Sequence, residues 1–362
     1  MLGCALASAA AAEVLYAPEG NRLRRIDLAT VGAPKLRREI FVENADRDPT
    51  RGRNINGMVC PLPDGTGRFV AGEDTGQPHP PAGWGVFEAN GAQVGKLVAT
   101  ATAELPDPYG CAVDAEGRLF TTEIGDRRFG RGNGQLVLWF PPFDRFPGAP
   151  GAFPATDATS SNACKLATDL ATATGIAIDA QGRVYVAASG GLRVERFSPP
   201  FPSGPDAAGG CGARDSTGAP LADHVQRDTF AWARPLAGLL TYSGLAFAPN
   251  GHLYAASVAT GRIAELDANG ALVRLVLAPR RWLPPFATGT PQGLAVDASG
   301  DLYYADLDLH FGDWSLRPGG DGKVWRIHFV DGAPQAPEIL IRGLEYPDGL
   351  GVLPGALAPR AP

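Results

Sequence analysis

The sequence has few charged residues, and the acidic ones outnumber the basic ones. Only 19% of its 362 residues are Asp, Glu, Lys or Arg, and the net charge at pH 7 is −6. Binding to phosphates requires basic surface, so this balance argues against a nucleic-acid partner. No apolar run in the rest of the chain reaches the roughly 18 residues that a membrane-spanning helix needs.

Motifs for several common chemistries are also missing. The chain has no Gly-rich phosphate loop, no Gly-x-Ser-x-Gly nucleophile elbow and no Cys-x-x-Cys pair. A nucleophilic serine triad therefore has no local support in the sequence.

Cysteine is scarce too, with five residues, and one of them lies in an apolar leader. Residues 1–12 (MLGCALASAAAA) end in small residues before Glu13, which resembles the end of a signal peptide whose basic start would lie upstream. A disordered Ala-rich tail or lipidation at Cys4 are the alternatives. We expect an exported protein, periplasmic or secreted. Removal of the leader leaves four cysteines, an even number that allows disulfides.

The chain is rich in residues that form turns, with 47 Gly and 33 Pro, and these residues recur in a repeat. Each repeat contains a glycine, an apolar run, a turn such as Ala-Ser-Gly, and a second apolar run. The repeats begin at Gly57, Gly110, Gly175, Gly244, Gly293 and Gly349, about 50 to 70 residues apart. Strand–turn–strand units at this period are typical of the blades of a β-propeller.

The two ends of the chain complement each other. The last repeat stops at Pro354 after one strand, and residues 13–28 match 252–267, the second and third strands of the fourth repeat. Pairing of the terminal strands would close the ring and remove its open edges. We therefore predict an all-β, six-bladed propeller over residues 13–355, with 356–362 as a tail. Residues 291–306 (PQGLAVDASGDLYYAD) give the chain a resemblance to NHL-repeat propellers.

Two long loops, 141–163 and 198–222, are rich in Pro, Gly and Ser, and each carries or adjoins one cysteine. A Cys164–Cys211 disulfide would join these loops, and two free thiols are the alternative. Cys60 and Cys111 fall in predicted innermost strands, where we expect them to be ordinary buried thiols.

Residues equidistant from a hairpin turn lie opposite each other, so two positions in each blade are expected to line the upper mouth of the central channel. The first set precedes the first strands: Asn56, Tyr109, Thr174, Ser243, Gln292 and Asp348. The second ends the second strands: Glu73, Glu123, Ala188, Ser257, Asp306 and, from the blade-six match, Glu19. Blades five, six, one and two thus form an acidic half, and blades three and four a neutral half.

Carboxylates that converge in this way repel one another unless something compensates. A divalent cation would do so, and Ca²⁺ accepts carboxylate and amide oxygens in flexible geometry. The predicted ligands are Glu19, Asn56, Glu73, Glu123, Asp306 and Asp348. Cationic side chains from the loops, or solvent in a wide channel, are the alternatives.

The mouth resembles that of the gluconolactonase and senescence-marker-protein family at three places. Asp348 lies in Tyr-Pro-Asp-Gly-Leu, Asn56 in Asn-Ile-Asn-Gly-Met, and Glu19 in Ala-Pro-Glu-Gly. The resemblance implies a divalent cation and a catalytic Asp348. The sequence departs from the family in the order of the Asp and Asn blades and in a missing second Asn.

Two functions follow from these observations. In a lactone or ester hydrolase, the cation would polarise the carbonyl, and Asp348 or a water that it activates would attack. Tyr109, Trp84, His310 and Trp314 would then contact the substrate, unless these aromatic residues simply pack the loops. In a non-catalytic NHL-repeat module, the same mouth would bind a small-molecule or peptide ligand, and its acidic half would attract cationic groups.

Overall fold

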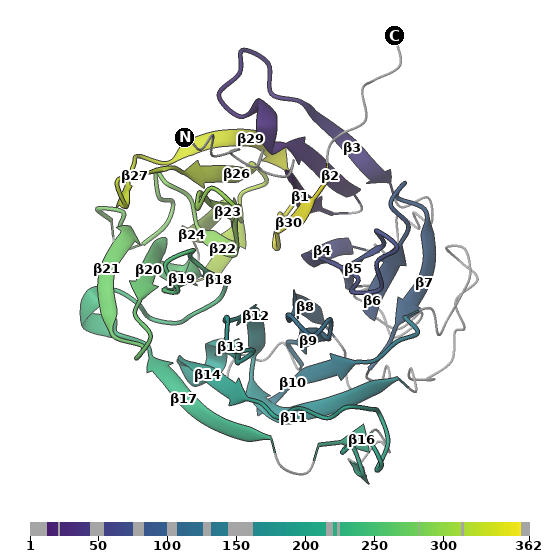
Figure 1. Ribbon diagram of the computed structural model, residues 1–362. Helices are drawn as coiled ribbons and strands as arrows, with labels where there is room; N and C mark the ends of the chain where they lie inside the picture. The colour runs from purple at the N-terminus through teal and green to yellow at the C-terminus, as the bar shows by residue number, and fades with distance from the viewer. Residues whose placement is uncertain are drawn as a thin grey trace, which may run out of the picture.

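The structure is a computed structural model in which the chain forms six β-sheets around a central axis (Figure 1). It describes residues 13–20, 22–43, 54–74, 83–99, 107–125, 132–143, 162–214, 220–222, 225–281, 283–312 and 315–355. The predicted leader and tail, 1–12 and 356–362, lie outside them. The helices in these ranges are three-residue 3-10 turns, and none is long or apolar enough to cross a membrane.

Each blade has its first strand at the axis and its fourth at the rim (Figure 1). Blade one comprises β4 (Asn54–Pro61), β5 (Phe69–Asp74), β6 (Gly83–Phe87) and β7 (Gln93–Leu97). Blade two comprises β8 (Pro108–Val113), β9 (Leu119–Glu123), β10 (Gly132–Trp139) and β11 (Ala163–Ala171). Blade three comprises β12 (Ala173–Ile178), β13 (Val184–Ala188), β14 (Arg193–Ser198) and β17 (Gln226–Trp232). Blades four and five comprise β18 (Leu245–Phe247), β19 (Leu253–Ser257), β20 (Arg262–Leu266) and β21 (Leu272–Leu277); β22 (Pro291–Val296), β23 (Leu302–Asp306), β26 (Gly322–Ile327) and β29 (Glu338–Leu344).

Blade six joins the two ends of the chain, as the sequence predicts. Its strands are β30 (Gly351–Pro354), β1 (Glu13–Glu19), β2 (Arg22–Asp27) and β3 (Arg38–Glu43). β1 pairs with β30 in antiparallel register, with Val14 opposite Leu353 and Tyr16 opposite Gly351. This pairing closes the ring, so the six-bladed propeller is confirmed.

An aspartate shapes the hairpin between the first and second strands of blades two, three and five. One oxygen of Asp114, Asp179 and Asp297 accepts the backbone N–H groups two and four residues further along, at 2.9 to 3.0 Å. In blades three and five the other oxygen accepts a hydrogen bond from Tyr185 or Tyr303. These hairpins lie at the opposite end of the innermost strands from the mouth, so these aspartates serve the turns.

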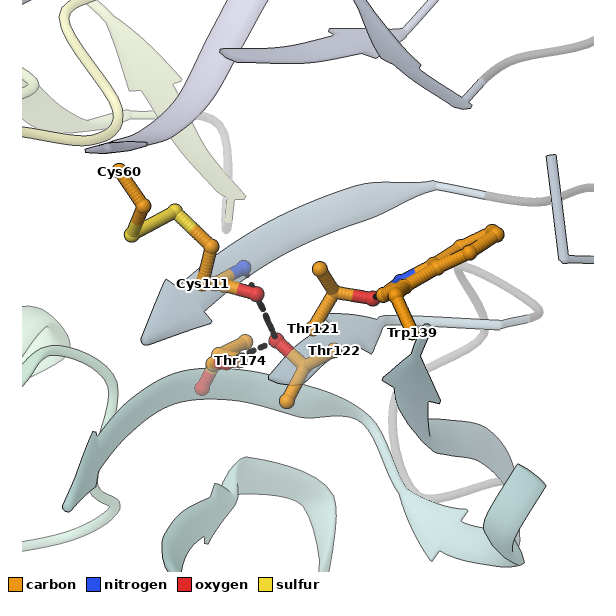
Figure 2. Close-up of a disulfide and its surroundings, with 7 residues drawn as sticks. Cys60, Cys111, Thr121, Thr122, Trp139 and Thr174 are labelled. Carbon is orange, nitrogen blue, oxygen red and sulfur yellow. Dashed lines mark hydrogen bonds between the residues drawn. A yellow bond between two sulfur atoms is a disulfide. The ribbon is translucent and has the colours of Figure 1, made fainter. Parts of the chain in front are cut away.

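Two disulfides cross between blades. Cys164 on β11 is bonded to Cys211 in the long loop of blade three, as predicted. A short strand of that loop, β16 (Pro220–Leu221), runs parallel to β11 and holds the loop against blade two. The expectation of free thiols at Cys60 and Cys111 is wrong, because β4 and β8 run side by side at the axis and bring these residues to a Cα–Cα distance of 6.0 Å, where they form the second disulfide (Figure 2).

We expect loss of the Cys60–Cys111 bond to destabilise the propeller. The bond closes a 51-residue separation, for which the chain-entropy account gives about 4 kcal/mol. Replacing both residues by Ser should lower the free energy of unfolding in urea by about 2 to 4 kcal/mol without reductant. The difference from the wild type should shrink in reductant, and a difference that persists there would contradict a disulfide origin.

Candidate functional site

The six repeat glycines meet at the axis and leave no room for a side chain. A Cβ on Gly175 would lie 2.2 Å from the carbonyl oxygen of Ser243, and one on Gly244 would lie 2.1 Å from that of Gln292. The same relation holds around the ring: Gly57 meets Tyr109, Gly110 meets Thr174, Gly293 meets Asp348, and Gly349 meets Gly57 itself. The residues that precede these glycines are therefore brought together at the mouth.

The predicted mouth residues at the ends of the second strands do not lie opposite the residues that precede the glycines. Glu73 pairs with Ile55, Glu123 with Pro108 and Asp306 with Pro291, in each case one residue before the predicted partner. A register shift follows each of these pairs, because the strand bulges at the repeat glycine. A one-residue shift turns a side chain to the other face of its sheet, which accounts for the partners that these carboxylates have.

Three of the predicted metal ligands are engaged within their own blades. Glu19 pairs with Arg24 at 2.6 Å. Glu73 is 1% exposed and lies 3.0 Å from Nζ of the equally buried Lys96. Intrablade cations thus compensate both carboxylates, which is one of the alternatives that the sequence left open, although these cations come from strands rather than loops.

Asp306, the third of them, holds its surroundings through four hydrogen bonds. Its Oδ1 accepts from the Thr290 backbone N–H at 2.7 Å, the Thr290 hydroxyl at 3.1 Å and the Asp308 N–H at 2.8 Å. Its Oδ2 accepts from the Trp325 indole at 3.0 Å. With both oxygens occupied, Asp306 acts as a clamp on the loop that enters β22.

Other predicted site residues lie apart from the mouth or outside the described part of the chain. Trp84 is fully buried in β6, so it belongs to the core, and His310 lies on an exposed strand beside Asp308. Glu123 is 1% exposed at the end of β9. Asn56 belongs to β4 but its side chain is not described, and Trp314 lies outside the described residues. Within the described ranges, no three His, Cys, Asp or Glu side chains gather to hold a metal ion.

Hydroxyl groups close the neutral half of the mouth and its border with blade two. The Thr122 hydroxyl donates to the Thr174 carbonyl at 2.5 Å (Figure 2), and the Thr174 hydroxyl lies 3.2 Å from the Ser243 carbonyl in the next blade. Thr174 also bonds to the Ser189 hydroxyl at 2.6 Å. These bonds satisfy the carbonyls that the glycines expose, so this half is structural. The sequence showed the small polar residues there but not their partners in the next blade.

In the acidic half, Tyr109 reaches across to two other blades. Its hydroxyl donates to the Asp348 carbonyl at 3.0 Å, and the Gln292 amide bonds to the phenol. Burial, and then the nearby Asp348 carboxylate, raise the pKa of Tyr109 well above its ordinary value, so it stays a neutral donor. Oε1 of Gln292 is buried and has no donor among the described side chains, and the Asp348 carboxylate, 7% exposed, lies near the same phenol.

Comparison with known proteins supports the architecture alone. No protein-family model and no curated protein matches the sequence. Among solved structures, the nidogen/laminin complex has a chain that is 13% identical, with 94% of this chain and 98% of that one covered and a TM-score of 0.54. The luciferin-regenerating enzyme is 14% identical, with 93% and 95% covered and a TM-score of 0.53. Our chain is thus a six-bladed β-propeller. Regucalcin, a calcium-binding protein from Agrobacterium tumefaciens, is 14% identical over 81% and 77% of the two chains, with a TM-score of 0.49.

The close approach at the axis predicts that one methyl group will disturb the whole propeller. Gly244→Ala places a Cβ against the Gln292 carbonyl, and overpacking of this kind costs about 1 to 3 kcal/mol or more. Gly312→Ala is the matched control, because no atom of the described residues lies within 4 Å of its Cβ. Urea unfolding should show a large loss only for Gly244→Ala, and equal stabilities would contradict the packing argument.

The buried tyrosines predict a loss of stability in alkali. Burial raises the pKa of Tyr109 and Tyr304 well above the ordinary value and that of Tyr242 and Tyr254 to about 12. The folded chain then keeps protons that the unfolded chain releases above about pH 10, at a cost of up to about 1.4 kcal/mol per pH unit for each group. The free energy of unfolding should fall between about pH 10 and about pH 12, and less steeply in Tyr109→Phe. A flat profile would contradict this prediction.

Proposed function

We propose that the chain is a binding propeller whose mouth takes a ligand bearing an ammonium or guanidinium group, such as a small amine or a basic side chain of a peptide. The Asp348 carboxylate and the Gln292 amide oxygen would accept its hydrogen bonds. The observation that carries this proposal is Oε1 of Gln292, a buried acceptor with no donor among the described residues, in a mouth that also holds the Asp348 carboxylate. A buried acceptor of this kind is costly unless something donates to it.

The charge at the mouth favours the same ligand. Asp348 and Asp107 both raise the pKa of the Tyr109 phenol, so the local field is negative. The Tyr109 hydrogen bond fixes the backbone at Asp348, and the Gln292 amide is oriented by the phenol. Two oriented acceptors in a negative field suit a donor-rich cation better than a neutral group or an anion.

A divalent cation is the second candidate for the mouth. Carboxylate and amide oxygens are ligands that Ca²⁺ accepts, but it takes six to eight oxygens, and Glu19, Glu73 and Asp306 have other partners. If bound there, the ion would lie on Asp348 and Gln292 and would polarise a carbonyl. Asp348 would then hold or orient an attacking water, as in a lactone or ester hydrolase. The likeness to the luciferin-regenerating enzyme is compatible with such a hydrolase.

Calorimetry with n-butylammonium and with Ca²⁺ separates the two candidates. We expect n-butylammonium to bind and Asp348→Asn to weaken it about tenfold or more, because a hydrogen bond to a charged group contributes about 1.5 to 3 kcal/mol. Gln292→Ala should weaken it less. Asp331→Asn, in an exposed turn, is the control and should change nothing.

Each result decides between the candidates. Binding of Ca²⁺ but not of the amine, with loss in Asp348→Asn, would overturn the amine site in favour of the cation. Turnover of a lactone or aryl ester that depends on Ca²⁺ and on Asp348 would then support the hydrolase. Absence of binding by either probe would overturn the mouth as a ligand site.

A further inference from the structure

A cavity of about 620 Å³ lies beside the connection from β21 to β22, on the same side of the propeller as the mouth. Its volume is in the range of about 300 to 1,000 Å³ that is usual for small-molecule sites. Six of the residues that line it are Pro279, Arg280, Arg281, Pro285, Phe286 and Thr288. Apart from the two arginines and one threonine hydroxyl, this lining is apolar.

The polar groups in this cavity are hydrogen-bond donors with unused capacity. Arg280 and Arg281 are both exposed, and neither forms an ion pair or hydrogen bond with a described residue. Oγ1 of Thr288 is buried and has no partner among the described residues either. The cavity thus combines three hydrogen-bond donors, from Arg280, Arg281 and Thr288, with an apolar lining. The mouth, in contrast, presents hydrogen-bond acceptors.

The cavity is preformed, because the loop that builds it is fixed at several points. The Phe286 ring packs against the turn at Gly261, where an added Cβ would lie 2.4 Å from the ring. The Tyr304 hydroxyl donates to the Thr288 carbonyl at 2.8 Å, and the Asp306 clamp holds Thr290. A ligand would therefore not have to order the loop in order to bind.

We propose that this cavity binds a small organic anion, a carboxylate or sulfonate with an aromatic or aliphatic body. The guanidinium groups of Arg280 and Arg281 would bind the anionic group, since arginine forms paired hydrogen bonds with two oxygens of a carboxylate or of a tetrahedral oxyanion. The Thr288 hydroxyl would donate a further bond. Pro279, Pro285 and Phe286 would cover the apolar part, which an inorganic anion would leave unused.

Fluorescence titration of the full chain with 8-anilinonaphthalene-1-sulfonate tests this proposal. We expect binding that weakens about tenfold or more when Arg280 and Arg281 are both replaced by Gln, and by a smaller factor in Thr288→Val. The uncharged analogue N-phenyl-1-naphthylamine should bind weakly and equally to the wild type and the double variant. Added salt should weaken the sulfonate and not the analogue.

Two control variants locate the effect. Arg342→Gln removes an exposed arginine from β29 of blade five and should leave the sulfonate affinity unchanged. Asp348→Asn should also leave it unchanged, because the mouth is a separate site, so the two proposals fail independently. An equal affinity for the wild type and the double variant, or equally tight binding of the uncharged analogue, would overturn the anion site. If the double variant does not fold, sulfonate binding to the wild type that does not respond to salt would overturn it as well.

Discussion

The innermost strands of the six blades approach one another so closely that only glycine fits at one position in each. From Gly57 to Gly349, each repeat glycine packs against the backbone of the next blade, and the last packs against the first. This closed set of contacts fixes the distance of every blade from the axis. It also determines that the residue before each glycine is the one whose carbonyl and side chain reach the mouth, which is why Tyr109, Gln292 and Asp348 come together.

Crowding at the axis also decides what happens to the acidic side chains. The bulge at the repeat glycine of blades one and five displaces the second strand by one residue, and Glu73 and Asp306 turn to partners within their own blades. A buried carboxylate is tolerated only with such partners. The chain therefore compensates these acidic residues blade by blade, whereas the Asp348 and Gln292 side chains lie near the Tyr109 phenol at the mouth.

The architecture could be predicted from the sequence because it depends on local patterns. The glycines and turns recur in each repeat, and the terminal strands are recognisable as the missing parts of one blade. The Cys60–Cys111 bond and the Lys96–Glu73 pair could not be predicted, because the first joins two blades and the second depends on the β-strand register. A count of residues from the turn at Ser299 places Gln292 opposite Asp306, and a bulge in the strand, invisible to such a count, makes Pro291 the partner instead.

The displaced carboxylate of Asp306 connects the two candidate sites. Had it faced the channel, the loop from β21 to β22 would lack its two hydrogen bonds from Thr290, and Thr288 and Phe286 would lose the anchor at that end of the loop. The same bulge that removes a negative charge from the mouth thus supplies the anchor for a cavity that carries two positive charges. The propeller can therefore present an acceptor-lined candidate site and a donor-lined candidate site on one face, and the Asp306 carboxylate anchors the loop of the second through Thr290.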